Sequence, residues 1–451
     1  MLRSSFTPSL RKLPLIVAVL ALVLVMGGVQ AQDGIGGTLT NLGFGLGDEI
    51  ARERVAHFQE LYPEVDLQMT EGALDEQQFL TAVASGNPPD MVYMGREVLS
   101  TYAIRGALMP LTDCIASQEI DMTQYRQAAV EQVTVGGVVY GIPEFFNNVM
   151  LMINTVALDE AGLTLEDIDP SDWDNINMLN DALTVGSGNS LNRIGYDPKL
   201  PEFLPLWAEA NGVSLISDDG RTAQLNDPKV VEALEFAYSL YATPGGYPPF
   251  KAFRDTWDFF GGNNQIVANQ VGMWPMEQWY MNVLAGVAPE GPIAFMPFED
   301  REGNPISYST GSAWAIPTGS KNPEAACAFM KAVTSPEAWI RAATARAELR
   351  AEAGAINTGV YTGNVLADEV IFSEIVTPSG NEIFDNGVQV ILSLQENAFA
   401  IAPNPAGAQF RQAWVDAVNR VINGEQSVQE ALDQAQAEAQ AALDEAWARQ
   451  Q

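Results

Sequence analysis

The stretch "TLTNLGFGLGDEIARERVAHFQEL", residues 38–61, decides the fold class, because a strand pattern runs directly into a helix pattern. Its first part, 38–44, alternates apolar and polar residues like a half-buried strand. After the turn "GLGD", apolar side chains recur at helical spacing, at Ile50, Val55, Phe58 and Leu61. Pro63 stops this helix, and "VDLQM" after it has the pattern of a second strand.

The same alternation continues along the chain. The breaker cluster "SGNPPD" precedes the strand pattern "MVYM" at 91–94, and a helix pattern covers 98–105. Strands that alternate with helices are typical of an α/β domain with a largely parallel sheet. A chain of 451 residues suits two or three domains, and no low-complexity linker divides it. We therefore expect lobes that interleave along the sequence.

The N-terminus has the pattern of a secretory signal peptide. Arg3, Arg11 and Lys12 precede the apolar run 13–26, and small residues allow cleavage after Ala31. This run is shorter than the roughly 20 residues that a membrane span needs. No cysteine lies near the cleavage site, so we expect an exported protein without a lipoprotein anchor, in the periplasm or at the cell surface.

The charge and the cysteines narrow the class of protein further. A formal net charge of −34 argues against a nucleic-acid partner and against anionic lipid surfaces. The two cysteines, Cys114 and Cys327, could form one disulfide in an exported protein. Two buried free thiols are the alternative, because Cys327 sits on an apolar helix stripe.

Several segments, taken in order, carry a resemblance to a known family. They are "FQELYPEVDLQM", "SGNPPDMVYM", "GALMPLTD", "VYGIPEFFNNVMLMINTVALDEAGL" and "GSAWAIPTGSKNPEAACAFMKAVTSPEA". Their order and spacing resemble the extracellular solute-binding proteins of ABC importers, the large sugar-binding family typified by maltose-binding protein. The resemblance runs from about Thr38 to Ala441. It departs from the family pattern at "RAELRAEAGAIN", so no ligand contact is carried over there.

The resemblance implies an α/β, two-lobed periplasmic-binding-protein fold with interleaved lobes and a central ligand cleft. By analogy, the chain crosses between the lobes near 143–150, 295–298 and 333–343. The expected parts are a signal peptide 1–31, an N-terminal lobe 32–145 plus 298–338, and a C-terminal lobe 146–297 plus 339–451. Hinge closure around a ligand is the motion that such a fold implies.

The segment "MWPMEQWYM", residues 273–281, holds the first binding candidates. A sugar has apolar C–H faces and a rim of hydroxyls, so its site needs aromatic platforms and convergent polar groups. We expect Pro275 to turn the chain from a buried strand into a helix, where open α/β sheets place ligands. Trp274 is then the expected platform, Glu277 its hydrogen-bond acceptor, and Trp279 a neighbouring aromatic.

Further candidates lie in loops, at helix starts, or at a position where the family has an aromatic lining the cleft. They are Trp207, Phe145, Asn147, Asn148, Phe44, Asp48, Arg96, Gly311, Ser312 and Trp314. Arg96 could donate paired hydrogen bonds. For each aromatic, packing in the core is the alternative interpretation.

Together these features predict the substrate-binding component of an ABC importer, a monomer that captures a carbohydrate and delivers it to membrane permease subunits. An oligosaccharide is favoured over a monosaccharide because the candidate aromatics are several. The sequence has no histidine-based triad, nucleophile elbow or zinc-ligand spacing, so we expect no catalytic residues, cofactor or metal. The alternatives are a secreted glycosidase or lyase, a binder of a polyol or sugar phosphate, and an adhesion or scaffold protein.

Overall fold

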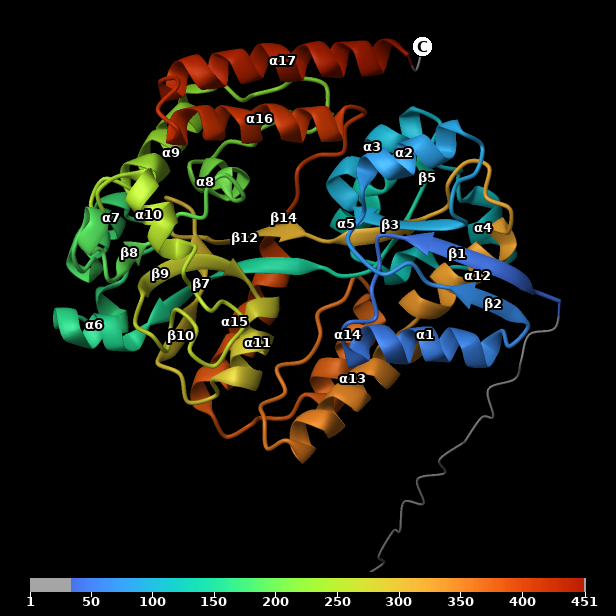
Figure 1. The fold of residues 1–451 in the computed structure, drawn as a ribbon, viewed down its shortest axis with the longest axis horizontal. Helices are drawn as coiled ribbons and strands as arrows, with labels where there is room; N and C mark the ends of the chain where they lie inside the picture. Colours follow the sequence, from blue (N-terminus) through green and yellow to red (C-terminus); the bar gives the residue numbers. More distant parts are fainter. Residues whose placement is uncertain (1–33, 450–451) are drawn as a thin grey trace, which may run out of the picture.

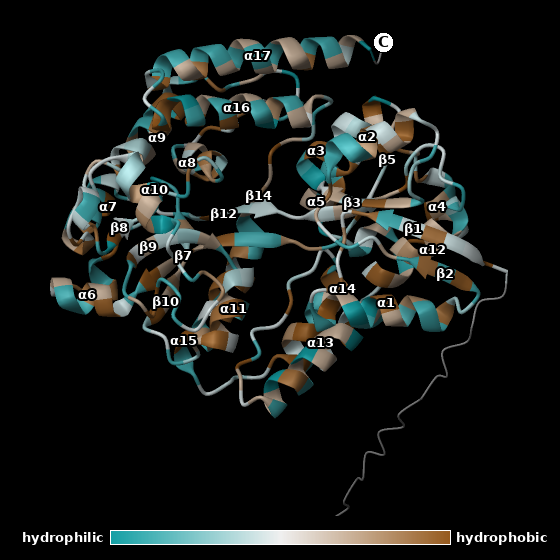
Figure 2. Cartoon of the chain, in the orientation of Figure 1, coloured by the Kyte–Doolittle hydropathy of each residue, from teal (hydrophilic) through white to brown (hydrophobic). Residues whose placement is uncertain are grey.

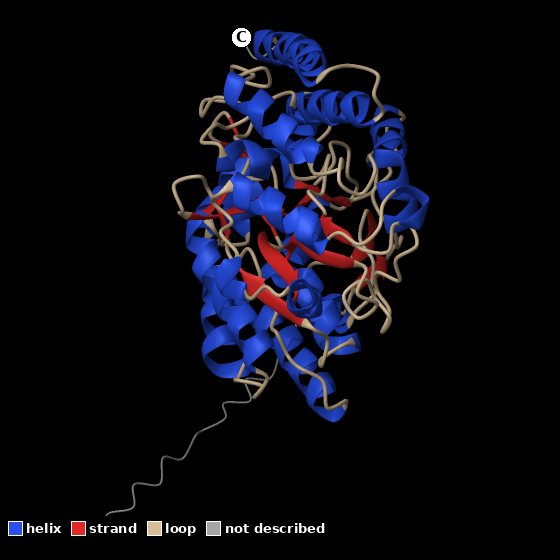
Figure 3. Ribbon diagram, turned by 90° about the vertical axis from the view of Figure 1, so that its left-hand side faces the viewer, coloured by secondary structure: helices blue, strands red, loops and turns tan. Residues whose placement is uncertain are grey.

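The computed structural model describes residues 34–449, so the signal peptide predicted at 1–31 lies outside the described residues. Two α/β lobes lie side by side, and strands run across the middle between them (Figure 1). A view from the side shows helices packed around the strands (Figure 3). Within the described residues, no helix combines the length and apolar character that a membrane crossing requires.

The N-terminal lobe is built on a sheet with the strand order β2–β1–β3–β13–β6. Strand β1 pairs in parallel with β2 and β3, whereas β13 pairs antiparallel with β3 and β6. The strands are β1 Gly37–Leu42, β2 Val65–Gln68, β3 Met91–Gly95, β6 Ile142–Pro143 and β13 Ser312–Ala315, with the hairpin β4 Thr134–Val135 and β5 Val138–Val139. The helices of this lobe are α1 Glu49–Leu61, α2 Glu76–Ala84, α3 Arg96–Ile104, α4 Thr112–Ser117, α5 Gln127–Gln132, α12 Pro323–Thr334, α13 Pro336–Glu352 and α14 Val365–Val370.

The first strand and helix form as the sequence predicts. The carboxylate of Asp48 caps α1 by accepting a hydrogen bond from the backbone N–H of Ala51 at 2.9 Å. The predicted apolar face is buried at Ile50, Val55 and Phe58. Figure 2 shows that the outer helices carry both hydrophilic and hydrophobic segments, as amphipathic helices do.

The C-terminal lobe contains the second sheet, in the order β11–β12–β7–β9–β8, with β10 paired to β7 and β14 paired to β12. Its strands are β7 Asn147–Asn154, β8 Ile194–Tyr196, β9 Val271–Glu277, β10 Ile293–Met296, β11 Phe298–Glu299, β12 Pro305–Thr310 and β14 Ala398–Phe399. Its helices are α6 Thr155–Ala161, α7 Trp173–Leu183, α8 Leu204–Ala210, α9 Pro228–Ser239, α10 Tyr247–Arg254, α11 Trp279–Val287, α15 Glu382–Leu394, α16 Gly407–Ile422 and α17 Val428–Ala448.

The chain first crosses between the lobes directly after β6, where β7 begins at Asn147. It returns through Gly311, which separates β12 in one sheet from β13 in the other. It crosses again between α14, which packs on α13, and α15, which packs on β10 and β7. The N-terminal end of α16 also touches the N-terminal lobe, because Ala408 N–H donates to the hydroxyl of Thr101 at 2.9 Å.

Two of the predicted lobe boundaries are wrong. Residues 298–310 belong to the C-terminal lobe, because β12 pairs with β7 through Ser309 and Asn148. Residues 339–370 stay with the N-terminal lobe, because α13 packs along α1. The guanidinium of Arg54 on α1 lies 3.9 Å from the ring centroid of Trp339 on α13, and it forms a buried ion pair with Glu144. The first crossing, from β6 to β7, lies within the range 143–150.

The two cysteines are joined in a disulfide between α4 and α12, with a Cα–Cα distance of 5.6 Å. Both helices belong to the N-terminal lobe, and the two cysteines lie 213 positions apart in the sequence. A bond between such distant residues restricts the unfolded chain strongly.

We predict that Cys114→Ser lowers the free energy of unfolding of the N-terminal lobe by about 2–4 kcal/mol, because the unfolded chain regains its freedom. Urea denaturation under non-reducing conditions measures the loss. Cys327→Ser should cause a similar loss, and the double variant little more, because all three lack the same bond. Full additivity of the two single losses would contradict the prediction.

Candidate functional site

Two cavities lie between the lobes and meet at Trp279. Cavity 1 has a volume of about 330 Å³ and is lined by Asp48, Phe145, Asn147, Gln278, Trp279, Asn282, Val283, Arg346, Gly359, Val360 and Tyr361. Cavity 2 has a volume of about 430 Å³ and is lined by Glu97, Lys199, Glu202, Phe203, Phe259, Met276, Glu277, Trp279, Tyr308, Thr310, Arg411 and Trp414. Each cavity takes residues from both lobes, as a ligand cleft requires.

Trp279 is the first residue of α11, and its indole is held in place from two sides. Its Nε1–H donates to Glu277 Oε2 at 2.5 Å, while the other oxygen of Glu277 accepts a hydrogen bond from the Thr310 hydroxyl. Phe260 stacks near Trp279 with a centroid distance of 6.3 Å and an interplanar angle of 20°. A fixed, partly exposed indole beside two cavities is an aromatic platform.

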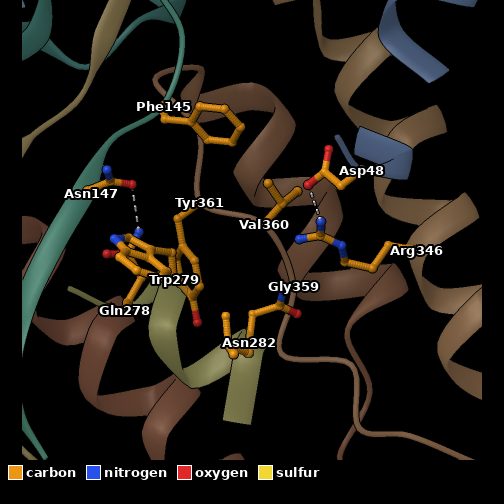
Figure 4. Close-up of a pocket in the computed structure, with 11 residues that line it drawn as sticks. Asp48, Phe145, Asn147, Gln278, Trp279, Asn282, Arg346, Gly359, Val360 and Tyr361 are labelled. Carbon is orange, nitrogen blue, oxygen red and sulfur yellow. Dashed lines mark hydrogen bonds and ion pairs between the residues drawn. The ribbon is translucent and has the colours of Figure 1, made fainter. Parts of the chain in front are cut away.

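The N-terminal lobe closes cavity 1 with a charged network (Figure 4). Arg346 on α13 donates to Asp48 Oδ2 at 2.9 Å and to Glu49 Oε1 at 2.5 Å. Burial, the largest single effect, raises the pKa of the Glu49 carboxyl, but the hydrogen bond and the charge of Arg346, with smaller contributions from the backbone and Arg350, together lower the pKa overall. The two ion pairs of Arg346 therefore present fixed acceptors and donors at the wall of the cavity.

The C-terminal lobe and the third crossing segment line cavity 1 with neutral polar groups (Figure 4). Gln278 Nε2–H donates to Asn147 Oδ1 at 3.4 Å, and Gln278 Oε1 accepts from the backbone N–H of Asn148 at 2.6 Å. Burial raises the pKa of Tyr361 well above its usual value, so the hydroxyl stays protonated. That hydroxyl is buried and has no hydrogen-bond partner within residues 34–449.

Cavity 2 combines aromatic rings with charges of both signs. Lys199 is almost fully buried and forms an ion pair with Glu202 at 3.0 Å. Glu97 comes from the start of α3 in the N-terminal lobe, and Arg411 comes from α16. Such a mixture of donors and acceptors around rings suits a ligand rich in hydroxyl groups.

A match to a family model decides the family. Residues 53–367 match the model of the bacterial extracellular solute-binding proteins. The chain belongs to that family. The family resemblance inferred from the sequence motifs is thereby confirmed.

Individual relatives of this solute-binding protein are distant. It is 23% identical over 329 residues to an arabinooligosaccharide-binding protein of Bacillus subtilis (strain 168), and the alignment covers 70% of this chain and 74% of the relative. The solved structure of CpMnBP1 with mannotriose bound superposes with a TM-score of 0.72 at 22% identity, covering 89% of this chain and 99% of that chain. The maltose/maltodextrin-binding domain MalE from Bdellovibrio bacteriovorus, bound to maltotriose, gives a TM-score of 0.68 at 18% identity, covering 90% and 99%. These likenesses confirm the two-lobed fold.

The structure brings some of the predicted binding residues together at the cleft. Trp279 lines both cavities, Glu277 lines cavity 2, and Asp48, Phe145 and Asn147 line cavity 1. Their contact with a ligand remains a prediction, but their positions are those that it requires.

The prediction that Trp274 is a platform is not supported, because this indole is 1% exposed and lines neither cavity. The strand does not end at Met273, as expected, but continues through Glu277. Pro275 therefore makes no turn; it pairs opposite Leu151 of β7, beyond the end of β8 at Tyr196. Because β8 has already ended at this position, no strand hydrogen bond to β8 would require the backbone N–H that proline lacks.

Other predicted site residues are packed inside the lobes. The Trp207 ring is fully buried, and its Nε1–H donates to the backbone carbonyl of Pro198 at 2.9 Å. Trp314 and Phe44 pack against each other in the N-terminal core, with a centroid distance of 4.8 Å. Asn148 is fully buried in β7. These four residues therefore pack inside the lobes and line neither cavity.

The prediction that Arg96 binds the ligand is also not supported, because this side chain is 1% exposed. Its guanidinium contacts the crossing segments and not the cavities. It donates to the backbone carbonyls of Phe145 and Thr310, one in each of the first two crossings. Gly311 lies beside it with φ +143°, and a Cβ at Gly311 would lie 2.3 Å from Arg96 Nη1. Gly311 and Ser312 line neither cavity, so the close approach of Arg96 explains the glycine.

The third crossing is held by a second buried charge. Arg126 donates to Asp368 at 2.6 Å and to Gln395 Oε1 at 2.9 Å. Asp368 Oδ1 also accepts from the backbone N–H of Thr362 at 3.0 Å, and Thr362 pairs with Phe145 of the first crossing. Burial raises the pKa of Asp368 to about 6, although Arg126 opposes the change.

Several cavity residues were missed by sequence reasoning. Lys199 follows β8 within "GYDPKLP", so the rule that ligands bind at strand ends could have identified it. Arg346 lies in the segment where the sequence departs from the family pattern. Asn282, Tyr361 and Arg411 had no signal in the sequence, because packing between distant segments brings them to the cleft.

We predict that Arg96→Met lowers the free energy of unfolding by about 2–5 kcal/mol, because two buried carbonyls lose a charged donor. Chemical denaturation measures the loss. As a matched control, Arg52→Met on the exposed face of α1 should change stability by less than about 0.5 kcal/mol. Equal losses in the two variants would contradict the role given to Arg96.

We predict a pH effect at the third crossing. The folded-state pKa of Asp368, about 6, lies above the usual value of 3.8, so protonation favours the folded state. The contribution is present at low pH and is lost as the pH rises through about 6. The melting temperature of wild type minus that of Asp368→Asn should therefore decrease as the pH is raised from 4.5 to 7.5. A difference that is constant or rises with pH would contradict the prediction.

Proposed function

We propose that this protein captures a carbohydrate in the cleft between its lobes and delivers it to the permease of an ABC importer outside the cytoplasmic membrane. The single observation that carries the proposal is Trp279, an indole fixed between two polar cavities. An aromatic face covers the C–H surface of a sugar ring, while the surrounding donors and acceptors bind its hydroxyls.

An oligosaccharide is the favoured ligand. Cavities on both sides of Trp279 give room for linked sugar units that share one aromatic platform. The names of the relatives support this choice, since one is an arabinooligosaccharide-binding protein and another was solved with mannotriose bound.

Ligand capture by closure of the two lobes is supported by the residues of the cavity walls, which belong to both lobes. Asp48 and Arg346 belong to the N-terminal lobe, whereas Trp279 and Asn282 belong to the C-terminal lobe. A ligand that touches both walls favours the closed arrangement by its differential affinity for that state. A permease can then distinguish the loaded protein from the empty one by the relative position of the lobes.

The site residues that we propose to contact the ligand are Trp279, Glu277, Asn147, Phe145 and Asp48 from the sequence prediction, joined by Asn282, Tyr361 and Arg346. The ion pair between Arg346 and Asp48 offers a fixed donor and acceptor. The protein is proposed to bind its ligand without turnover, as a transport component does.

We predict that Trp279→Ala raises the Kd for the preferred oligosaccharide by about 10- to 100-fold, because the platform is removed. Isothermal titration calorimetry against arabino-, manno- and malto-oligosaccharides, with a polyol and a sugar phosphate included, identifies the ligand and measures the change.

The matched control is Trp274→Phe, because Trp274 is buried in the same segment and lines neither cavity. That variant should keep the wild-type Kd even if its melting temperature falls. Tight binding of a polyol or sugar phosphate alone would contradict the carbohydrate assignment, and release of shortened oligosaccharides would favour a glycosidase or lyase.

A further inference from the structure

The outer end of cavity 1 is bridged by one arginine. Helices α11 and α13 come from different lobes and face each other on one side of the molecule (Figure 1). Arg350 on α13 donates through Nη2 to Asn282 on α11, to the backbone carbonyl at 3.3 Å and to Oδ1 at 3.2 Å. Asn282 lines cavity 1, so this contact joins the lobes at the cavity itself.

The surroundings of Arg350 offer no interaction stronger than its hydrogen bonds to Asn282. Within residues 34–449 it forms no ion pair, whereas Arg346, one turn earlier, binds Asp48 and Glu49. Burial and the charge of Arg346 lower the pKa of Arg350, and Glu49 opposes this effect. Arg350 remains charged at neutral pH, and its hydrogen bonds within residues 34–449 go to Asn282 across the cleft.

The contact also orients the side chain of Asn282. An amide oxygen that accepts from Arg350 leaves the amide nitrogen, with its two N–H donors, to the cavity. Asn282 is drawn in Figure 4 at the lower edge of cavity 1, near Gly359 and across from Asp48. A ligand hydroxyl in cavity 1 would therefore meet a donor at this position.

A glycine on α11 makes room for the arginine. A Cβ added at Gly286 would lie 2.2 Å from Arg350 Nη1, a distance that the guanidinium could only relieve by moving away. Gly286 is the last residue but one of α11 and is exposed, so alanine suits its helical backbone and meets the far end of a flexible side chain.

We propose that Arg350 is a latch across the cleft: it holds α11 against α13 and orients the Asn282 amide to donate to ligand in cavity 1. Arg350 is thus a positioning residue for ligand capture, and the proposal deepens the proposed function and rests on it. Breaking the latch should mainly speed ligand release, because the lobes separate before the ligand leaves.

The test compares Arg350→Ala, Gly286→Ala and the double variant with wild type and with Arg341→Ala. Arg341 lies on the same helix but binds Glu53 and Glu60 within the N-terminal lobe. Small-angle scattering of the ligand-free proteins should show a larger radius of gyration for the two latch variants and the double variant only. The melting temperature of Gly286→Ala should equal or exceed that of wild type, because alanine favours the helical backbone more than glycine does.

With the oligosaccharide identified by calorimetry, stopped-flow measurements should show a dissociation rate about tenfold higher for Arg350→Ala and for Gly286→Ala. The dissociation rate of the double variant should be no higher than that of either single variant, because both changes remove the same contact.

The two proposals fail in different ways. Absence of binding by the wild-type protein to every sugar tested would overturn the proposed function, and the scattering comparison would still decide on the latch. Gly286→Ala with the wild-type radius of gyration and dissociation rate would overturn the latch and leave the proposed function standing. Additive effects of the two substitutions on the dissociation rate would also overturn it.

Discussion

The buried guanidinium of Arg96 joins the two segments through which the chain first passes between the lobes. It donates to the carbonyls of Phe145 and Thr310 and, at 2.9 Å, to Gln132 Oε1. A charge without exposure to water is costly unless its hydrogen bonds are satisfied, so these acceptors must stay where they are. Burial lowers the pKa of Arg96 to about 10, which leaves it protonated at neutral pH.

The cleft depends on this arrangement. Because the first two crossings are held together, β7 and β12 enter the C-terminal sheet as neighbours, and β9 pairs along the other edge of β7. The end of β9 delivers Glu277 and Trp279 to the cleft, where Thr310 of β12 binds Glu277. On the opposite wall, Asp48 at the start of α1 and Glu97 at the start of α3 follow strands of the N-terminal sheet. The position of the site is thus determined by where the strands of the two sheets end beside the crossings.

The comparison of Trp274 with Trp279 shows where sequence reasoning stops. Both tryptophans lie in one short segment, and both were expected beside a turn. The segment is instead a strand through Glu277, and pairing of Met152 with Trp274 places that indole inside the lobe. A continuous apolar run is compatible with a strand buried on both faces as well as with a helix start. Only the pairing partners β7 and β8 decide between them.

The sequence by itself determined the α/β class, the first strand and helix, and the family, because these depend on local periodicity and on motifs in order. It also identified the segment 273–281 and the residues Asp48, Phe145 and Asn147 that reach the cleft. The tertiary structure alone decided that the lobes exchange at Gly311 and after α14, and that Arg96 is a structural residue. It also decided that Arg346, Asn282 and Tyr361 complete cavity 1. These outcomes depend on contacts between residues far apart in the chain, which no local pattern encodes.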